Sequence, residues 1–284
     1  MKKRVVVLDF DGTVTDAEEE GKPFVTGYLN DMRLLLDKSL DDMSLIVQSA
    51  ETEIAANPKD NGWVYDGVVV APATVDPYLR IQAVARLVFD RFGRFLNHKD
   101  RQSLLQLLFA HNYSLSGTVF KDGAAQLLHD VGSNKEVVGY IVTNSSTEAV
   151  CKKMARLGEL YPKLARPGIQ VIGGAKKYVV RGQPEHVPGR LAMPGLDRYI
   201  YLHRSAYYSI LEDIREENNI SWEDMAVIGD IFELDLAMPL VLGTKIGLVA
   251  NQFTPQYERD FITSHPTRAT LINSLSEVLP FVLR

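Results

Sequence analysis

The chain has 284 residues, of which 46% are hydrophobic and 24% charged, a composition typical of a globular protein with one large domain or two ordinary ones. The formal net charge of −5 favours neither a nucleic acid nor an acidic membrane surface as a partner. The single cysteine excludes an intrachain disulfide and is typical of a reducing compartment. Because no stretch approaches the ~20 apolar residues of a membrane helix, we expect a cytoplasmic protein that binds neither nucleic acid nor membrane.

The most informative stretch is residues 5–13, which read Val-Val-Val-Leu-Asp-Phe-Asp-Gly-Thr. The apolar, β-branched run predicts a strand that is buried on both faces. Asp9 and Asp11 follow it at a spacing of two, so both carboxylates can point to one place beyond the strand end, and Gly12 allows a sharp turn there. The carboxyl ends of parallel strands are where open α/β sheets bind ligands.

Residues from about 16 to 115 are predicted to be mainly helical. We expect a polar, exposed loop as far as Pro23, and a helix that begins at this proline because proline is tolerated at a first helical position. Further helices are expected after Ser39, which forms a capping box with Asp42, after Asp76 and after Asn97. Residues 62–70 predict a short hairpin or an aromatic loop.

From about residue 116 onward, short apolar strands alternate with helices. The expected strands are residues 137–143, 169–172, 198–202, 225–229, 245–249 and, as an edge strand, 269–272. Short connections between such units predict an α/β fold, a Rossmann-like doubly wound parallel sheet that also contains residues 5–8. The helical block is therefore an insertion into this domain, and the irregular segment 176–197 is an excursion from the sheet.

Several other strand ends carry polar residues that can converge on Asp9 and Asp11. They are Thr143 and Asn144 with Ser145, Asp230 with Asp235, and a basic group supplied by Arg204 or by Lys176 and Lys177. The strand-to-helix turn at Thr143 offers backbone N–H groups and a helix N-terminus, which suit a phosphate. A capping box of Ser145 and Glu148 is expected to begin the helix that follows.

This set of residues is suited to phosphoryl transfer. Clustered carboxylates repel one another unless a cation compensates, and Mg²⁺ prefers such oxygen ligands together with a substrate phosphate. One aspartate can then act as a nucleophile and form an aspartyl-phosphate, while the aspartate two residues later protonates the leaving oxygen and later takes a proton from water. A basic side chain and backbone amides stabilise the transferred group.

Residues 9–14, DFDGTV, resemble the DxDGT signature of the haloacid dehalogenase-like superfamily. Thr143 resembles the second motif of that superfamily, and residues 229–235 resemble the fourth, of GDxxxxD type. The resemblance implies a catalytic core of residues 1–15 and 116–284, with residues 16–115 forming a helical cap domain of the C1 type that closes over the site and selects the substrate.

The resemblance also implies roles for single residues. Asp9 would be the nucleophile, Asp11 the general acid and base, and Thr143, with Asn144 beside it, a phosphate ligand. The cofactor would be Mg²⁺, held by Asp9, the Asp11 carbonyl and Asp230, with Asp235 nearby.

The third motif of the superfamily is usually a lysine, and its position in this chain is ambiguous. Arg204 stands near the start of the helix before the fourth motif and is slightly favoured as the cation. Lys176 and Lys177 follow a strand end and are the alternatives. Because arginine binds phosphate bidentately and lysine acts as a point charge, the two possibilities are not equivalent.

Together these features predict a Mg²⁺-dependent phosphatase that hydrolyses a small phosphorylated metabolite through an aspartyl-phosphate. The alternatives are a phosphomutase or phosphonatase of the same superfamily, or a catalytically silent module that binds a ligand or partner protein. A dinucleotide-binding oxidoreductase is disfavoured because no G-x-G-x-x-G follows the first strand. The physiological substrate and the oligomeric state are left open.

Overall fold

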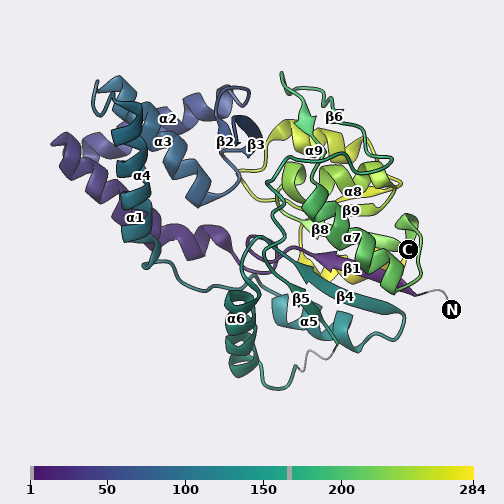
Figure 1. The fold of residues 1–284 in the computed structure, drawn as a ribbon. Coiled ribbons are helices and arrows are strands. Elements are labelled where there is room, and N and C mark those ends of the chain that lie inside the picture. Colours follow the sequence, from purple (N-terminus) through teal and green to yellow (C-terminus); the bar gives the residue numbers. More distant parts are fainter. Residues whose placement is uncertain (1–2, 165–167) are drawn as a thin grey trace. The chain divides into compact units, whose positions relative to one another are not determined.

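The structure, a computed structural model, describes residues 3–164 and 168–284 (Figure 1). The chain divides into two compact units. The first consists of Met1–Asp16, Val64–Ala71 and Phe120–Arg284, and the second of Ala17–Trp63 and Pro72–Val119. Residues 64–71 thus group with the first unit although they lie inside the range predicted for the cap. The predicted domain limits, residues 1–15 with 116–284 and residues 16–115, stay a prediction.

The first unit is built on a six-stranded sheet in which every pairing is parallel, in the order β10-β9-β8-β1-β4-β5. Its strands are β1 Arg4–Leu8, β4 Val137–Val142, β5 Gln170–Ile172, β8 Met225–Gly229, β9 Lys245–Val249 and β10 Ala269–Ile272. The predicted α/β fold, a Rossmann-like doubly wound parallel sheet with an inserted mainly helical domain, is confirmed. Since β1 lies in the middle of the sheet, its carboxyl end is flanked by the ends of two neighbouring strands.

The pairing register places these strand ends side by side. Leu8, the last residue of β1, pairs with Ile141 of β4 and with Ile228 of β8. The backbone N–H of Asp9 still donates to the Ile228 carbonyl at 2.8 Å, so the aspartate begins where the strand pairing ends. Residues that follow β1, β4 and β8 therefore meet at one edge of the sheet.

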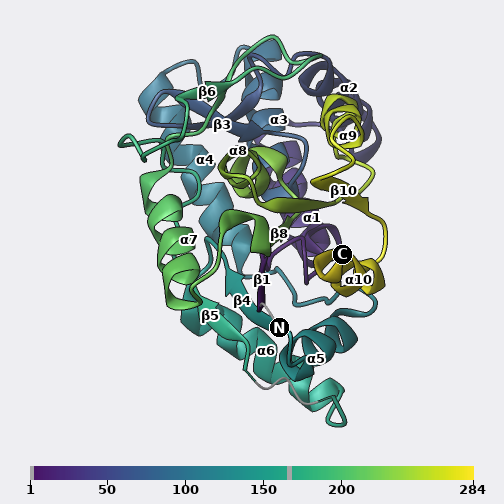
Figure 2. The same cartoon turned by 90° about the vertical axis from the view of Figure 1, so that its right-hand side faces the viewer.

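Helices cover both faces of the sheet, and successive side chains of β1 point alternately toward these two layers of helices. Val5 and Val7 belong to one buried cluster with apolar residues of α7, α8 and α9. Val6 and Leu8 belong to a second cluster with α5, α6 and α10. Figure 2 shows α7 and α10 on opposite sides of β1 and β8. The helices are α5 Ala124–Ser133, α6 Thr147–Leu160, α7 Ser205–Glu217, α8 Ala237–Leu242, α9 Gln256–Thr263 and α10 Val278–Leu283.

Part of the predicted sheet lies elsewhere. Within the expected strand 198–202, only β7 Ile200–Tyr201 is extended, and it pairs antiparallel with β6 Arg190–Leu191 and not with the main sheet. The segment 176–197 is mostly irregular, as predicted, and it includes β6. Residues 165–167 lie outside the described residues.

The second unit is mainly helical. Its helices are α1 Ala17–Leu36, α2 Leu40–Ala56, α3 Pro77–Arg91 and α4 His98–Tyr113. Phe24, Tyr28 and Met32 of α1 pack with Val84 and Val88 of α3 in one buried cluster.

The hairpin of β2 Gly62–Tyr65 and β3 Val68–Pro72 confirms one of the two predicted forms of residues 62–70. Among the residues that the structure describes, no helix combines the length and apolar character needed to cross a membrane.

The first helix of this unit begins earlier than predicted. It starts at Ala17 and contains Pro23, so the expected exposed loop before Pro23 is wrong. The acidic residues 18–20 form its first turn, where negative charge interacts favourably with the helix dipole. Proline removes one helical hydrogen bond, but Gly21 and Phe24 on either side are buried. Tertiary packing therefore outweighs the local preference.

The helix after β4 is capped by a different serine from the one expected. Ser146 is the N-cap of α6 and accepts the backbone N–H of Ala149 at 3.2 Å. The predicted box of Ser145 and Glu148 is therefore wrong by one residue. As a result, the hydroxyl of Ser145 is available to the neighbouring strand end.

Candidate active site

Asp9 and Asp11 follow β1 at the edge where the strand ends meet. The Asp9 side chain is buried, whereas that of Asp11 is 34% exposed. Gly12, which directly follows Asp11, adopts φ +85°, a conformation that favours glycine. A Cβ at Gly12 would lie 2.2 Å from Oδ2 of Asp230, so the missing side chain lets the β1 turn approach the Asp230 carboxylate closely.

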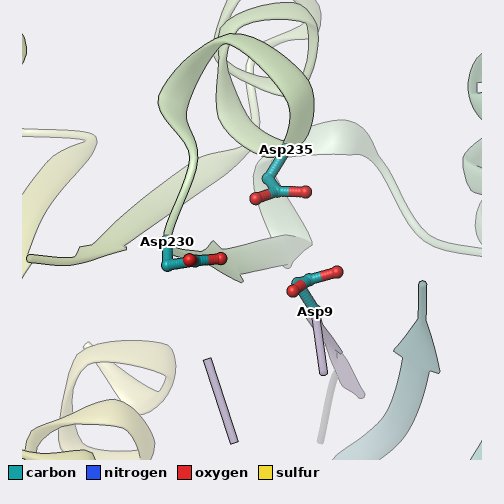
Figure 3. A group of neighbouring side chains, drawn as sticks. All are labelled: Asp9, Asp230 and Asp235. Atoms are coloured by element: carbon teal, nitrogen blue, oxygen red, sulfur yellow. The ribbon is translucent and has the colours of Figure 1, made fainter. Parts of the chain in front are cut away.

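Three buried aspartates from two strand ends share one small space. Carboxylate oxygens of Asp9, Asp230 and Asp235 all lie within 4.8 Å of one another. Figure 3 shows the three carboxylates turned toward one another. Asp230 directly follows β8, and Asp235 lies in η2 Phe232–Leu236, a turn of π-helix after that strand. A Cβ at Gly229 would lie 2.4 Å from the Asp235 Cβ, so the glycine allows η2 to fold back on the strand end.

These residues fit a magnesium ion. All three side chains offer carboxylate oxygens, the donor type that Mg²⁺ prefers, and all three are buried. Three such negative charges in one place need a compensating cation. The neighbouring Lys177 supplies a single positive charge, so a divalent cation is compatible with the remaining charge.

Lys177 lies directly on this carboxylate cluster. Its side chain is 1% exposed, and its Nζ donates to Oδ1 of Asp9 at 2.7 Å and to Oδ1 of Asp235 at 2.8 Å. Burial raises the pKa of Asp9 to about 7; Lys177 acts against this rise, while Asp235 and Asp11 add to it. Burial lowers the pKa of Lys177, but the charges of Asp235 and Asp9 outweigh it and raise that pKa above its ordinary value. The ammonium therefore stays charged.

The turn after β4 supplies hydroxyl and amide groups. The Thr143 hydroxyl accepts the backbone N–H of Ser145 at 3.2 Å and lies 3.4 Å from the Asp11 carboxylate. Asn144, predicted as a phosphate ligand, accepts the backbone N–H of Lys177 at 2.8 Å through its side-chain oxygen. In this structure Asn144 therefore fixes the backbone of Lys177, while the Thr143 hydroxyl lies beside the Asp11 carboxylate.

Asp11 is held by Ser145, which was expected near it, and by Lys153, which was not predicted as a site residue. The hydroxyl of Ser145 donates to its carboxylate at 2.6 Å, and Nζ of Lys153 donates to it at 2.9 Å. Lys153 lies on α6, at helical spacing from the buried residues Val150 and Leu157. A lysine within an otherwise apolar stripe was the sequence signal that could have identified it.

The other two basic candidates lie differently. Arg204 is buried, and its guanidinium donates to the backbone carbonyls of Tyr201, Lys177 and Val70. Among the described residues, no carboxylate lies within ion-pairing distance of it. Lys176 is exposed, with φ +50°. The structure thus brings together Asp9, Asp230, Asp235 and Lys177. Arg204, which was slightly favoured as the third-motif cation, instead contacts the backbone carbonyl of Lys177.

No protein-family model matches the chain, and no curated protein matches it either. Solved structures do match over nearly the whole length. YfnB from Bacillus subtilis, a HAD-hydrolase candidate solved with bound magnesium, is 15% identical, with 100% of both chains covered and a TM-score of 0.52. A phosphoglycolate phosphatase predicted in Haemophilus somnus is 11% identical (99% of this chain and 98% of that chain covered, TM-score 0.54).

A third match is a candidate β-phosphoglucomutase from Thermotoga maritima, 13% identical, with 99% of this chain and 98% of that chain covered and a TM-score of 0.50. At these identities the similarity shows the fold. The chain therefore has the fold of haloacid dehalogenase-like proteins, as the resemblance of its motifs implied.

Proposed function

We propose that this chain, which has the haloacid dehalogenase-like fold, is a Mg²⁺-dependent phosphatase that hydrolyses a small phosphorylated metabolite in the cytoplasm. The observation that carries the proposal is the contact of buried Asp9 with Lys177 at 2.7 Å, within a cluster of three aspartates. A carboxylate at the end of a central parallel strand, paired with a fixed ammonium, is suited to attack phosphorus.

In the first step, a carboxylate oxygen of Asp9 attacks the phosphorus atom and the bond to the leaving oxygen breaks. Asp11, in its protonated form, gives its proton to that oxygen, so the alcohol leaves neutral and Asp9 carries the phosphoryl group. The ammonium of Lys177, on the Asp9 carboxylate, stabilises the negative charge of the transferred group. We assign Thr143 the binding of a phosphoryl oxygen.

In the second step, a water molecule attacks the phosphorus atom of the aspartyl-phosphate. Asp11, now ionised, takes the proton of that water, the bond to Asp9 breaks and inorganic phosphate is released. Both aspartates thereby return to their starting forms. Ser145 and Lys153, which hold the Asp11 carboxylate, keep it next to Asp9 during both steps.

Asp9, Asp230 and Asp235 are the side chains that would hold Mg²⁺, together with the Asp11 carbonyl. When bound, the ion neutralises charge on the phosphoryl oxygens and on the carboxylate cluster. Lys177 supplies one positive charge against three carboxylates, so without the ion the cluster keeps excess negative charge.

A panel of small phosphomonoesters tests the proposal directly. The purified chain should release inorganic phosphate from at least one of them with Mg²⁺ present, and chelation with EDTA should abolish the release. Asp9→Asn should lose this activity, whereas Asp122→Asn, a change at an exposed residue, should keep it. Binding of phosphorylated compounds without turnover would instead support a silent binding module, and conversion to an isomeric phosphate would support a phosphomutase.

A further inference from the structure

The guanidinium of Arg204 joins three separate segments of the sheet unit. The side chain is 1% exposed and is the largest fully buried one among the described residues. Its Nε donates to the carbonyl of Tyr201 at 3.1 Å, its Nη2 to that of Val70 at 3.0 Å, and its Nη1 to that of Lys177. Burial lowers its pKa to about 10, so the side chain remains a cation at neutral pH. All three acceptors are backbone oxygens, so this arginine is used to fix the chain.

One of these acceptors is the backbone of the lysine that contacts the candidate nucleophile. The backbone of Lys177 is held at both of its polar groups, since Asn144 accepts its N–H at 2.8 Å and Arg204 donates to its carbonyl. A lysine side chain has several rotatable bonds, so the place of its ammonium depends on how firmly the backbone is held. Arg204 therefore acts on Asp9 through Lys177.

A second acceptor lies in the hairpin that is inserted between α2 and α3. Val70 and Ala71 of β3 are fully buried, and residues 64–71 group with the sheet unit. A further polar contact of this segment is the ion pair of Asp66 with Arg181, in which both side chains are largely exposed. Exposed ion pairs contribute little, whereas a buried hydrogen bond to a charged donor contributes more. The bond from Arg204 is thus the stronger of these two polar contacts.

We propose that Arg204 is a positioning residue that holds Lys177 in place and makes the β3 backbone at Val70 part of the same support. The inference rests on the proposed function, in which Lys177 stabilises the group transferred to Asp9. Without the guanidinium, the carbonyls of Val70 and Lys177 lose a buried donor, and the lysine backbone is free to shift. A displacement of about 1 Å is enough to lower a catalytic rate about 10²-fold.

A double-mutant cycle tests whether Arg204 acts through Lys177. We expect Arg204→Gln to lower kcat/KM about 30-fold in the otherwise unchanged chain, but less than about 3-fold in a Lys177→Met background. The control is Arg198→Gln, which removes another largely buried arginine, one that pairs bidentately with Glu233 at 2.8 and 2.6 Å. The control should lower kcat/KM by the same factor in both backgrounds. An equal factor for Arg204→Gln in both backgrounds would overturn the proposal.

Hydrogen exchange followed by mass spectrometry gives a second readout that needs no substrate. Exchange at residues 68–72 and 175–179 should be at least about 10-fold faster in Arg204→Gln than in Arg198→Gln, because local opening no longer breaks the buried bonds. Equal rates in the two variants would contradict the proposal. If the wild-type chain hydrolyses no phosphomonoester, the proposed function fails, and the exchange comparison alone decides whether Arg204 holds these segments.

Discussion

Lys177 places a buried positive charge between two buried carboxylates. Moving charges out of water is costly, and pairing offsets the cost only when the geometry is close. Here the Nζ lies 2.7 Å from Asp9 and 2.8 Å from Asp235. Burial alone would raise the pKa of Asp9, and the ammonium opposes this rise. The lysine therefore favours the ionised form of Asp9, which is the form that acts as a nucleophile.

Replacing this lysine should be far more damaging than replacing its neighbour. Lys177→Met leaves two buried carboxylates without their ammonium, so we expect kcat/KM to fall about 10²-fold or more. The matched control is Lys176→Met, which changes an exposed lysine in the same segment and should leave kcat/KM within about 2-fold. Steady-state kinetics with Mg²⁺ measures both, and a larger loss in the Lys176 variant would contradict the account.

At the scale of single residues, the positions of the aspartates were predictable because they directly follow apolar strands. Asp9 and Asp230 could be placed at one sheet edge from the strand pattern alone. Arg204 was slightly favoured over Lys177 on motif position, because chain spacing does not show which way a side chain points. The contact of Lys153 with Asp11 joins a helix to a strand end 142 positions away, so the local signal, a lysine within the apolar stripe of α6, did not show which group it contacts.

At the scale of elements, the site depends on two strand ends that approach other groups closely. The turn after β1 needs Gly12, and the turn from β8 into η2 needs Gly229. Unbroken runs of apolar residues predicted these strands, but the π-helical turn that carries Asp235 was not predicted. The early start of α1 was missed because local signals favoured Pro23, whereas burial of Gly21 and Phe24 extends the helix across it.

A methyl group at the end of β8 should displace η2. In Gly229→Ala the new Cβ would lie 2.4 Å from the Cβ of Asp235, so one of the two segments must move. We expect a loss of about 1–3 kcal/mol in the free energy of unfolding, as for other overpacked sites. Gly117→Ala is the control, because a Cβ there meets nothing within 4 Å. Urea denaturation compares the two, and an equally small effect of both would show that η2 does not depend on this close approach.

At the scale of the whole molecule, the sheet unit holds a buried carboxyl group that the proposed reaction does not use. Glu258 is fully buried, and within the part of the chain that the structure describes neither of its carboxylate oxygens has a hydrogen-bond partner. Burial, with a smaller contribution from Glu233, raises the pKa of Glu258 well above its ordinary value, against the effect of Arg198. The folded chain therefore holds a proton that the unfolded chain releases as the pH rises.

This group should make the protein less stable as the pH increases. The stabilisation from the raised pKa is fully present below the unfolded value of about 4.5 and is lost as the pH rises from there through the folded pKa. Glu258→Gln removes the ionisation, so at pH 7 it should raise the free energy of unfolding by about 1–3 kcal/mol and should flatten this pH dependence. Denaturation at several pH values measures the effect, with the exposed Glu223→Gln as control. A variant as pH-dependent as the wild type would contradict the assignment.

Magnesium should stabilise the whole fold if the aspartate cluster binds it. A ligand that binds only the folded state adds about 2.7 kcal/mol to the free energy of unfolding when present at 100 times its Kd. Thermal unfolding with and without Mg²⁺ should show this shift in the wild type and in Asp122→Asn, and should show little of it in Asp230→Asn. A full shift in the Asp230 variant would place the ion elsewhere.

In the proposed reaction, Asp9 itself carries the phosphoryl group. Reaction of the chain with a hydrolysed phosphomonoester and Mg²⁺, quenched with borohydride, reduces an aspartyl-phosphate to homoserine, which mass spectrometry locates in the tryptic peptide of residues 5–33. We expect homoserine at position 9, only with substrate present, and an unchanged Asp11. Continued phosphate release with Asp9 never modified, or a phosphorylated residue elsewhere, would contradict it.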